Sequence, residues 1–216
     1  MYKAVVISGY LTHLSENIKS FLDKNTDVYV HTWNNNDNIR WVNKLKRFEK
    51  HCKSINIKVD EPLFEKKLYS YFYSTWKAVN LINDIDKYDL IIKFKPNLET
   101  EWLKVDLDLE KYFHKAYIQT YPLLKNKTKE ECFFGSIYHK TLDERLFFGY
   151  PLGFKKVFHI LYKELEELML NLDNSLTEQF QEKYEGSIFW KEFIEKRGVN
   201  LIQHNDLRIP DNIQIL

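Results

Sequence analysis

Two lysines at the end of an apolar run are the first residues whose types and spacing suggest chemistry. The run 90–92 predicts a central strand, and its alternation places Lys93 and Lys95 on one face. Two ammonium groups at a strand end are costly to bury without an anion, and a diphosphate would supply that anion. Asn97 and Glu99 follow with oxygens that can bind a hard cation. The alternative is a pair of solvated lysines on an edge strand.

A second cluster of polar side chains follows the first predicted strand. Ser8, Gly9 and Tyr10 lead into Thr12 and His13. Glycine allows close approach of backbone to a ligand, the hydroxyls and imidazole can donate to a phosphate or a base, and the tyrosine can stack on a base. The glycine fingerprints of dinucleotide-binding and P-loop folds are absent from the sequence. An ordinary strand-to-helix turn is the competing interpretation.

Two acids in the second half of the chain are candidates for proton transfer. Asp143 precedes the apolar segment 146–148, where a carboxylate can accept a proton from a hydroxyl or orient one. An ion pair with Arg145 is the alternative role for that acid. Glu185 precedes a predicted helix, where it either faces an acceptor sugar or stabilises the helix N-terminus.

Strands alternating with helices must position these side chains, which predicts an α/β sandwich with a mostly parallel sheet. Residues 34–38 are expected to form a polar loop, and Glu61-Pro62 to begin the clearest helix, which continues to Ile82. Residues 146–151 are expected to end in a turn. The predicted strands are 5–8, 27–33, 54–59, 89–95, 116–121, 201–203 and 206–209, and the other predicted helices are 14–22, 39–52, 154–168 and 188–195.

Composition excludes several classes of protein. The chain has 216 residues, a formal net charge of +1 and 44% hydrophobic residues, which suits one substantial domain and gives no basic excess for nucleic acid. Cys52 and Cys132 give neither a disulfide framework nor a zinc spacing, so we expect reduced thiols. No apolar run has the length of a signal peptide or a membrane span, which predicts a cytoplasmic protein.

The order of short motifs along the chain resembles a family of GT-A-like glycosyltransferases. These occur in bacterial surface-polysaccharide clusters and in large DNA viruses, including those of algae. The motifs are Val-Ile-Ser-Gly-Tyr, Asp-Val-Tyr-Val-His-Thr-Trp, Tyr-Ser-Tyr-Phe-Tyr-Ser-Thr-Trp-Lys-Ala, Tyr-Asp-Leu-Ile-Ile-Lys-Phe-Lys-Pro-Asn-Leu and Leu-Asp-Glu-Arg-Leu-Phe-Phe-Gly. The resemblance implies one GT-A-like domain over residues 1–216, a three-layer sandwich with its nucleotide-binding part at about 1–100 and its acceptor side at about 101–216.

The resemblance also implies an activity, which is the transfer of a hexosyl or pentosyl group from a nucleotide sugar to a glycan hydroxyl. A UDP-sugar is the favoured donor, and the expected location is the cytoplasm, that of the host if the protein is viral. By analogy, the turn from Ser8 to His13 lines the nucleotide pocket with Thr32 and Trp33, and Lys77 lies on the helix beside it. Asp143 or Glu185 would orient or deprotonate the acceptor.

The family's strand-end motif usually reads Arg-x-Arg-Pro-Asp, and its acid stands where GT-A enzymes bind a metal. The matching residues here are Lys93, Lys95, Pro96 and Asn97, so an amide replaces the acid. The family resemblance implies a divalent cofactor, Mn²⁺ or Mg²⁺. The amide at Asn97 puts this metal dependence in question. It also leaves a second interpretation open, a non-catalytic module that binds a nucleotide sugar or a glycan.

A third interpretation is a protein-interaction domain that keeps only the α/β scaffold. Its docking patch would be an exposed aromatic surface of Trp33, Trp41 and Tyr73.

Overall fold

A computed structural model describes residues 1–11, 16–64, 67–94, 96, 132–138, 141–173 and 193–204. Seven described strands form one sheet in the order β3-β2-β1-β4-β6-β5-β7. Strands β1 to β4 are mutually parallel, and β6 is antiparallel to both of its neighbours, whereas β7 is parallel to β5. The predicted α/β fold with a mostly parallel sheet is therefore confirmed. The strands are β1 (Lys3–Ser8), β2 (Thr26–Trp33), β3 (Ser54–Asp60), β4 (Leu90–Phe94), β5 (Cys132–Tyr138), β6 (Thr141–Gly149) and β7 (Asn200–His204).

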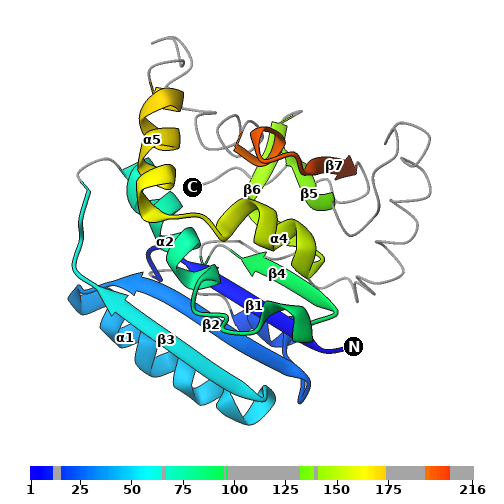
Figure 1. Cartoon of the computed structure of the whole chain (residues 1–216). Helices are drawn as coiled ribbons and strands as arrows, with labels where there is room; N and C mark the ends of the chain where they lie inside the picture. The colour runs from blue at the N-terminus through cyan, green and yellow to red at the C-terminus, as the bar shows by residue number, and fades with distance from the viewer. Residues whose placement is uncertain are drawn as a thin grey trace.

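Helices cover both faces of this sheet, which makes three layers (Figure 1). One helical layer contains the 3₁₀-helices η1 (Glu16–Phe21) and η2 (Lys46–His51) and the α-helix α1 (Asn36–Leu45). The other contains α2 (Lys67–Val79), η3 (Ile85–Lys87), α4 (Pro151–Phe158) and α5 (Tyr162–Asp173). Alternate residues of β1 pack into the two cores, since Val5 and Ile7 contact the first layer and Ala4 and Val6 the second.

The predicted polar loop at 34–38 is wrong in its second half, because α1 begins at Asn36. The side chain of Asn35 caps the helix by accepting a hydrogen bond from the backbone N–H of Asn38 at 2.8 Å. Asparagine competes with a helix in its interior but stabilises one at the N-cap. The helix predicted at 39–52 is also divided, since α1 ends at Leu45 and η2 follows it.

The helix start predicted at Glu61-Pro62 is wrong as well. Strand β3 runs on to Asp60, the Glu61 carboxylate accepts a hydrogen bond from Asn34 at 2.6 Å, and residues 61–64 have no helical structure. The described helix α2 begins at Lys67. The pairing of β3 with β2 and the hydrogen bond from Asn34 to Glu61 thus override a local signal for a helix start.

The predicted long helix at 154–168 is two helices, because the backbone turns at His159. Side chains of α2 bond the carbonyls at this break: Trp76 Nε1 donates to Ile160 at 3.1 Å, and Asn80 Nδ2 donates to Phe158 at 3.0 Å. The segment 146–149, expected to lead into a turn, is the end of strand β6, and β5 before it was not predicted. The expected strands 116–121 and 206–209, and the start of the expected helix 188–195, lie outside the described residues.

Asp27 connects three elements at the amino-terminal edge of the sheet. Its carboxylate accepts hydrogen bonds from Tyr2 and Tyr88 at 2.8 Å and from Ser54 at 2.6 Å. Burial raises the pKa of Asp27, but these three hydrogen bonds and the nearby Lys87 ammonium together hold the pKa below its ordinary value. In the described part of the chain, no helix is both long and apolar enough to cross a bilayer.

Candidate functional site

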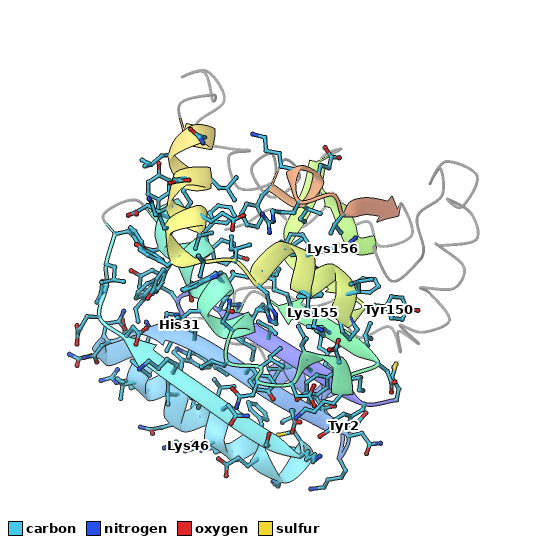
Figure 2. All side chains as sticks on the ribbon, viewed as in Figure 1. Tyr2, His31, Lys46, Tyr150, Lys155 and Lys156 are labelled. Carbon is cyan, nitrogen blue, oxygen red and sulfur yellow. The ribbon has the colours of Figure 1, made fainter. Side chains whose placement is uncertain are left out.

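The carboxyl-terminal ends of β1, β2 and β3 bring polar residues together beside helix α2. Ligands of open α/β sheets bind at this edge, because the chain turns there and leaves backbone groups and side chains to meet them. His31 lies toward this edge of the sheet, whereas Tyr2 lies toward the opposite one (Figure 2). The turn after β1 and the end of β2 form the candidate site.

Gly9 forms the turn after β1 in a conformation that favours glycine, with φ of 95°. A Cβ at this position would lie 3.4 Å from the ring of Tyr71. The Gly9 N–H lies 2.7 Å from Ser74 Oγ and 3.2 Å from the carbonyl of His31. The Gly9 carbonyl accepts from Thr32 Oγ1 at 2.8 Å. Both backbone polar groups of Gly9 are therefore held by hydrogen bonds to other residues of the protein.

His31 is buried beneath the turn and connects β3 to α2. Its Nδ1 lies 2.8 Å from Ser74 Oγ, and its Nε2 lies 3.1 Å from the carboxylate of Asp60. Burial lowers the pKa of His31, and the hydrogen bond that His31 donates to the Asp60 carboxylate opposes this only in part. Burial raises the pKa of Asp60, but hydrogen bonds from His31 and Lys58 outweigh it and lower that pKa. The pair is therefore a neutral imidazole donating to a carboxylate.

The set Ser74, His31 and Asp60 has the residue types of a nucleophilic triad but not the accessibility. Ser74 is fully buried, and its Oγ accepts the Gly9 N–H and lies 3.1 Å from the carbonyl of His31. A nucleophile must reach a substrate carbon, which this oxygen cannot do. The three residues instead hold the floor of the turn in one geometry.

Thr32 and Trp33, both predicted to line the pocket, are fully buried at the end of β2. The indole of Trp33 stacks on Tyr73 with ring centroids 5.7 Å apart, and its Nε1 has no hydrogen-bond partner among the described residues. Buried donors are nearly always satisfied, so an orphaned one indicates a site for a ligand or water. The exposed docking patch expected at Trp33 and Tyr73 is wrong, since these side chains are 0% and 7% exposed.

The two predicted cations in the described part of the site differ in exposure. Lys93 is 0% exposed on the α2 face of β4, and its Nζ lies 4.4 Å from the ring centroid of Tyr71 and 4.9 Å from that of Phe147. Lys77 is half-buried on α2, with its Nζ 5.7 Å from the Tyr73 centroid. Lys93 is thus enclosed between side chains of α2 and β6, whereas Lys77 keeps part of its surface exposed.

Of the remaining predicted residues, Ser8 and Tyr10 have side chains that the structure describes, and the others do not. Ser8 is buried and bonds Thr75 through their hydroxyls at 2.8 Å, whereas Tyr10 is 44% exposed. Asp143 lies in β6, but its side chain falls outside the described part, as do the residues Thr12, His13, Lys95, Asn97, Glu99 and Glu185. Among the described residues, no three His, Cys, Asp or Glu side chains gather as metal ligands.

The sequence motifs do not single out Ser74, Asp60 or Asn38 as site residues. His31 occurs in them only as part of a strand motif. Asn38 joins the two strand ends, since its Oδ1 accepts from the Leu11 N–H and its Nδ2 donates to the Trp33 carbonyl, both at 2.8 Å. Alternation in β2 was a usable signal for His31, because it places this residue on the same face as Tyr29. No local pattern identified the others.

Comparisons with known proteins show the fold. No protein-family model and no curated protein matches the chain. Two solved structures of the glycosyltransferase GlyE from Streptococcus pneumoniae TIGR4, one of them the apo form, align over 95% and 93% of the chain with TM-scores of 0.54 and 0.53 at 8% identity. A glycosyltransferase involved in glycosylation of the major capsid of PBCV-1 aligns over 95% of the chain and 82% of its own length, with a TM-score of 0.45 and 10% identity.

The chain therefore has a GT-A-like fold. It spans less than half of the GlyE chain, 45% and 46% in the two structures. Because sequence identity is this low, the structural similarity shows the fold and not the activity.

Proposed function

We propose that the chain is a glycosyltransferase domain that moves a sugar from a nucleotide-sugar donor, a UDP-sugar in the first instance, to a glycan hydroxyl. The donor would bind at the carboxyl ends of β1 to β4. The observation that carries this proposal is Nε1 of Trp33, a donor with no hydrogen-bond partner among the described residues, at the strand edge where α/β folds bind ligands. The turn at Gly9 follows β1, which is the strand paired with β2.

The described residues support donor binding in distinct ways. Tyr10 is exposed and offers a ring for stacking on a base. The floor formed by Ser74, His31 and Thr32 fixes the backbone that such a base would meet. Lys93 would stabilise the diphosphate as it gains charge, and its burial strengthens this effect because a low dielectric screens charge weakly.

In the proposed transfer, the acceptor oxygen forms a bond to the anomeric carbon as the bond from that carbon to the diphosphate oxygen breaks. The hydroxyl proton passes to a carboxylate, for which Asp143 and Glu185 are the candidates, and the nucleoside diphosphate leaves with the bonding electron pair. Asn97 and Glu99 are the proposed contacts for Mn²⁺ or Mg²⁺ or for the donor ribose. When bound, such an ion would add positive charge at the diphosphate.

The second candidate function is a non-catalytic module that binds a nucleotide sugar or a glycan. The amide at Asn97 favours it, because an amide is a weaker ligand for a hard cation than a carboxylate. The variant Asn97→Asp separates the two candidates. A large rise in donor hydrolysis or transfer would indicate a site that has lost its metal, and no change would indicate an amide with its own role.

The first experiment is thermal unfolding with UDP, GDP, dTDP and CMP and their sugar forms, with and without Mn²⁺. A ligand that binds only the folded state raises its stability by mass action, so we expect the melting temperature to rise with one of these nucleotides. The variant Trp33→Phe keeps a ring against Tyr73 but removes Nε1, and it should reduce that rise.

Trp76→Phe is the matched control, because its Nε1 already donates to a carbonyl outside the site. It should lower the melting temperature without ligand but leave the nucleotide effect unchanged. Absence of a shift with every nucleotide would contradict the proposal.

A further inference from the structure

A pocket lies in the helical layer on the far side of the sheet from α2. Its volume is about 470 Å³, and residues of η1, α1 and η2 line it. Lys46, the first residue of η2, lies in this layer (Figure 2). The lining residues are Lys19, Trp41, Lys44, Arg47, Phe48, Lys50 and His51.

The charge around this pocket has one sign. Four of its seven lining residues are Lys or Arg, and none is Asp or Glu. The whole chain has a net charge of only +1, so the excess of cations is local. Four ammonium and guanidinium groups around one concavity repel one another, and an anion bound among them would relieve this repulsion.

Two aromatic rings complete the pocket. Phe48 is almost fully buried and joins the core on the η1 side, whereas Trp41 is half-buried in the wall. The Nζ of Lys44 lies 3.8 Å from the ring centroid of Trp41, and the Nζ of Lys19 lies 5.5 Å from that of Phe48. Each ring thus has an ammonium group beside it, which places apolar surface and positive charge at the same spot.

Size and shape limit the ligand. A volume of this order suits a small molecule or a few sugar units rather than an extended strand of nucleic acid. The Trp41 indole, which has the Lys44 ammonium over its ring, offers apolar surface, and the lysines and Arg47 offer donors for carboxylate or phosphate oxygens. A ring that carries an anionic group satisfies both features.

We propose that this pocket binds an acidic carbohydrate, a sugar ring that carries a carboxylate or a phosphate, as a second site for the glycan. The choice of a carbohydrate rests on the proposed transferase function, whereas the anionic character rests on the pocket alone. A site on this face would hold part of an acidic acceptor chain away from the reacting hydroxyl.

Titration calorimetry at low salt tests the proposal with four probes: trigalacturonate, its neutral trimethyl ester, mannose 6-phosphate and inorganic phosphate. We expect at least one acidic sugar to bind, and we expect its affinity to fall as salt rises. Salt screens the attraction between charges, with a Debye length of about 10 Å at 0.1 M. The neutral ester should not bind. Binding by trigalacturonate alone would identify a uronate site, and binding by mannose 6-phosphate alone a phosphosugar site. Inorganic phosphate binding as tightly as the sugars, or no binding by either acidic sugar, would overturn the proposal.

Variants locate the binding. The double variant Arg47→Gln with Lys50→Gln should lower the affinity for the acidic sugar about tenfold. Lys46→Gln is the matched control, because Lys46 is exposed on the same helix but does not line the pocket. Trp41→Leu should weaken the sugars more than it weakens inorganic phosphate. If Lys46→Gln weakens acidic-sugar binding as much as the double variant does, the result would contradict a defined pocket.

The same variants distinguish this proposal from the proposed function. The double variant should leave the melting-temperature rise with nucleotide unchanged, since the pocket and the strand-end site lie in different layers. Acidic-sugar binding without any nucleotide effect would support the pocket and contradict the transferase. A nucleotide effect without acidic-sugar binding would do the reverse.

Discussion

The Nδ1 atom of His31 lies 2.8 Å from the hydroxyl oxygen of Ser74, and this contact joins strand β2 to helix α2 beneath the turn at Gly9. A neutral His31 donates a hydrogen bond from Nε2 to Asp60 and accepts one from the Ser74 hydroxyl at Nδ1. If His31 takes up a proton, Nδ1 becomes a donor, and the Ser74 hydroxyl can turn to the His31 carbonyl 3.1 Å away. The network therefore has a complete hydrogen-bond arrangement for either charge state.

Ser74→Ala should destabilise the fold by about 1–3 kcal/mol, because it leaves the Gly9 N–H and His31 Nδ1 without their shared partner in a buried site. Denaturant unfolding measures this free energy. Ser70→Ala is the control one turn earlier on α2, where the hydroxyl donates to the Phe64 carbonyl at 3.2 Å. Equal losses for the two variants would contradict the special role of Ser74.

Stability should fall as the pH is lowered through the ordinary pKa of histidine, 6.5, toward the lower pKa of His31 in the folded protein. In this window the unfolded chain binds more protons than the folded one, so its free energy drops relative to the native state. The contribution of His31 is complete above pH 6.5. The measurement is the free energy of unfolding as a function of pH.

His31→Gln should remove part of that pH dependence. His159 also has a pKa lowered by burial, so His159→Gln is needed to separate the two contributions. A pH slope that His31→Gln leaves intact would show that His31 titrates normally in the folded protein.

Gly9→Ala should cost more than the same change at Gly198. Both glycines have positive φ, 95° and 73°, where an alanine is strained by about 1–2 kcal/mol. Among the described residues, a Cβ at Gly198 meets nothing within 4 Å, whereas one at Gly9 meets the Tyr71 ring at 3.4 Å. Comparison of the two unfolding free energies tests this difference.

The same pair of variants tests whether the turn belongs to the nucleotide site. Only Gly9→Ala should reduce the melting-temperature rise with nucleotide. If Gly198→Ala reduces it equally, the effect is global and the turn has no particular part in binding.

The central strands and their order of appearance could be predicted from the sequence, because continuous apolar runs such as Val5–Ile7 and Leu90–Ile92 are typical of strands covered on both faces. The turn at Gly9 could also be predicted, since a glycine follows directly after such a run. Predictions failed where distant side chains decided the outcome. Trp76 and Asn80 bond the carbonyls at the break between α4 and α5, and no signal within 154–168 reveals them.

The sequence by itself determined the α/β class, the mostly parallel sheet and the strand ends at which Ser8, Thr32 and Lys93 lie, because these depend on hydrophobic pattern and local turn chemistry. Only the tertiary structure decided that Trp33 and Tyr73 are buried against each other rather than exposed. It alone placed His31 between Asp60 and Ser74, residues 29 and 43 positions away. Hydrogen bonds over such separations depend on how strands and helices pack, and no local spacing encodes them.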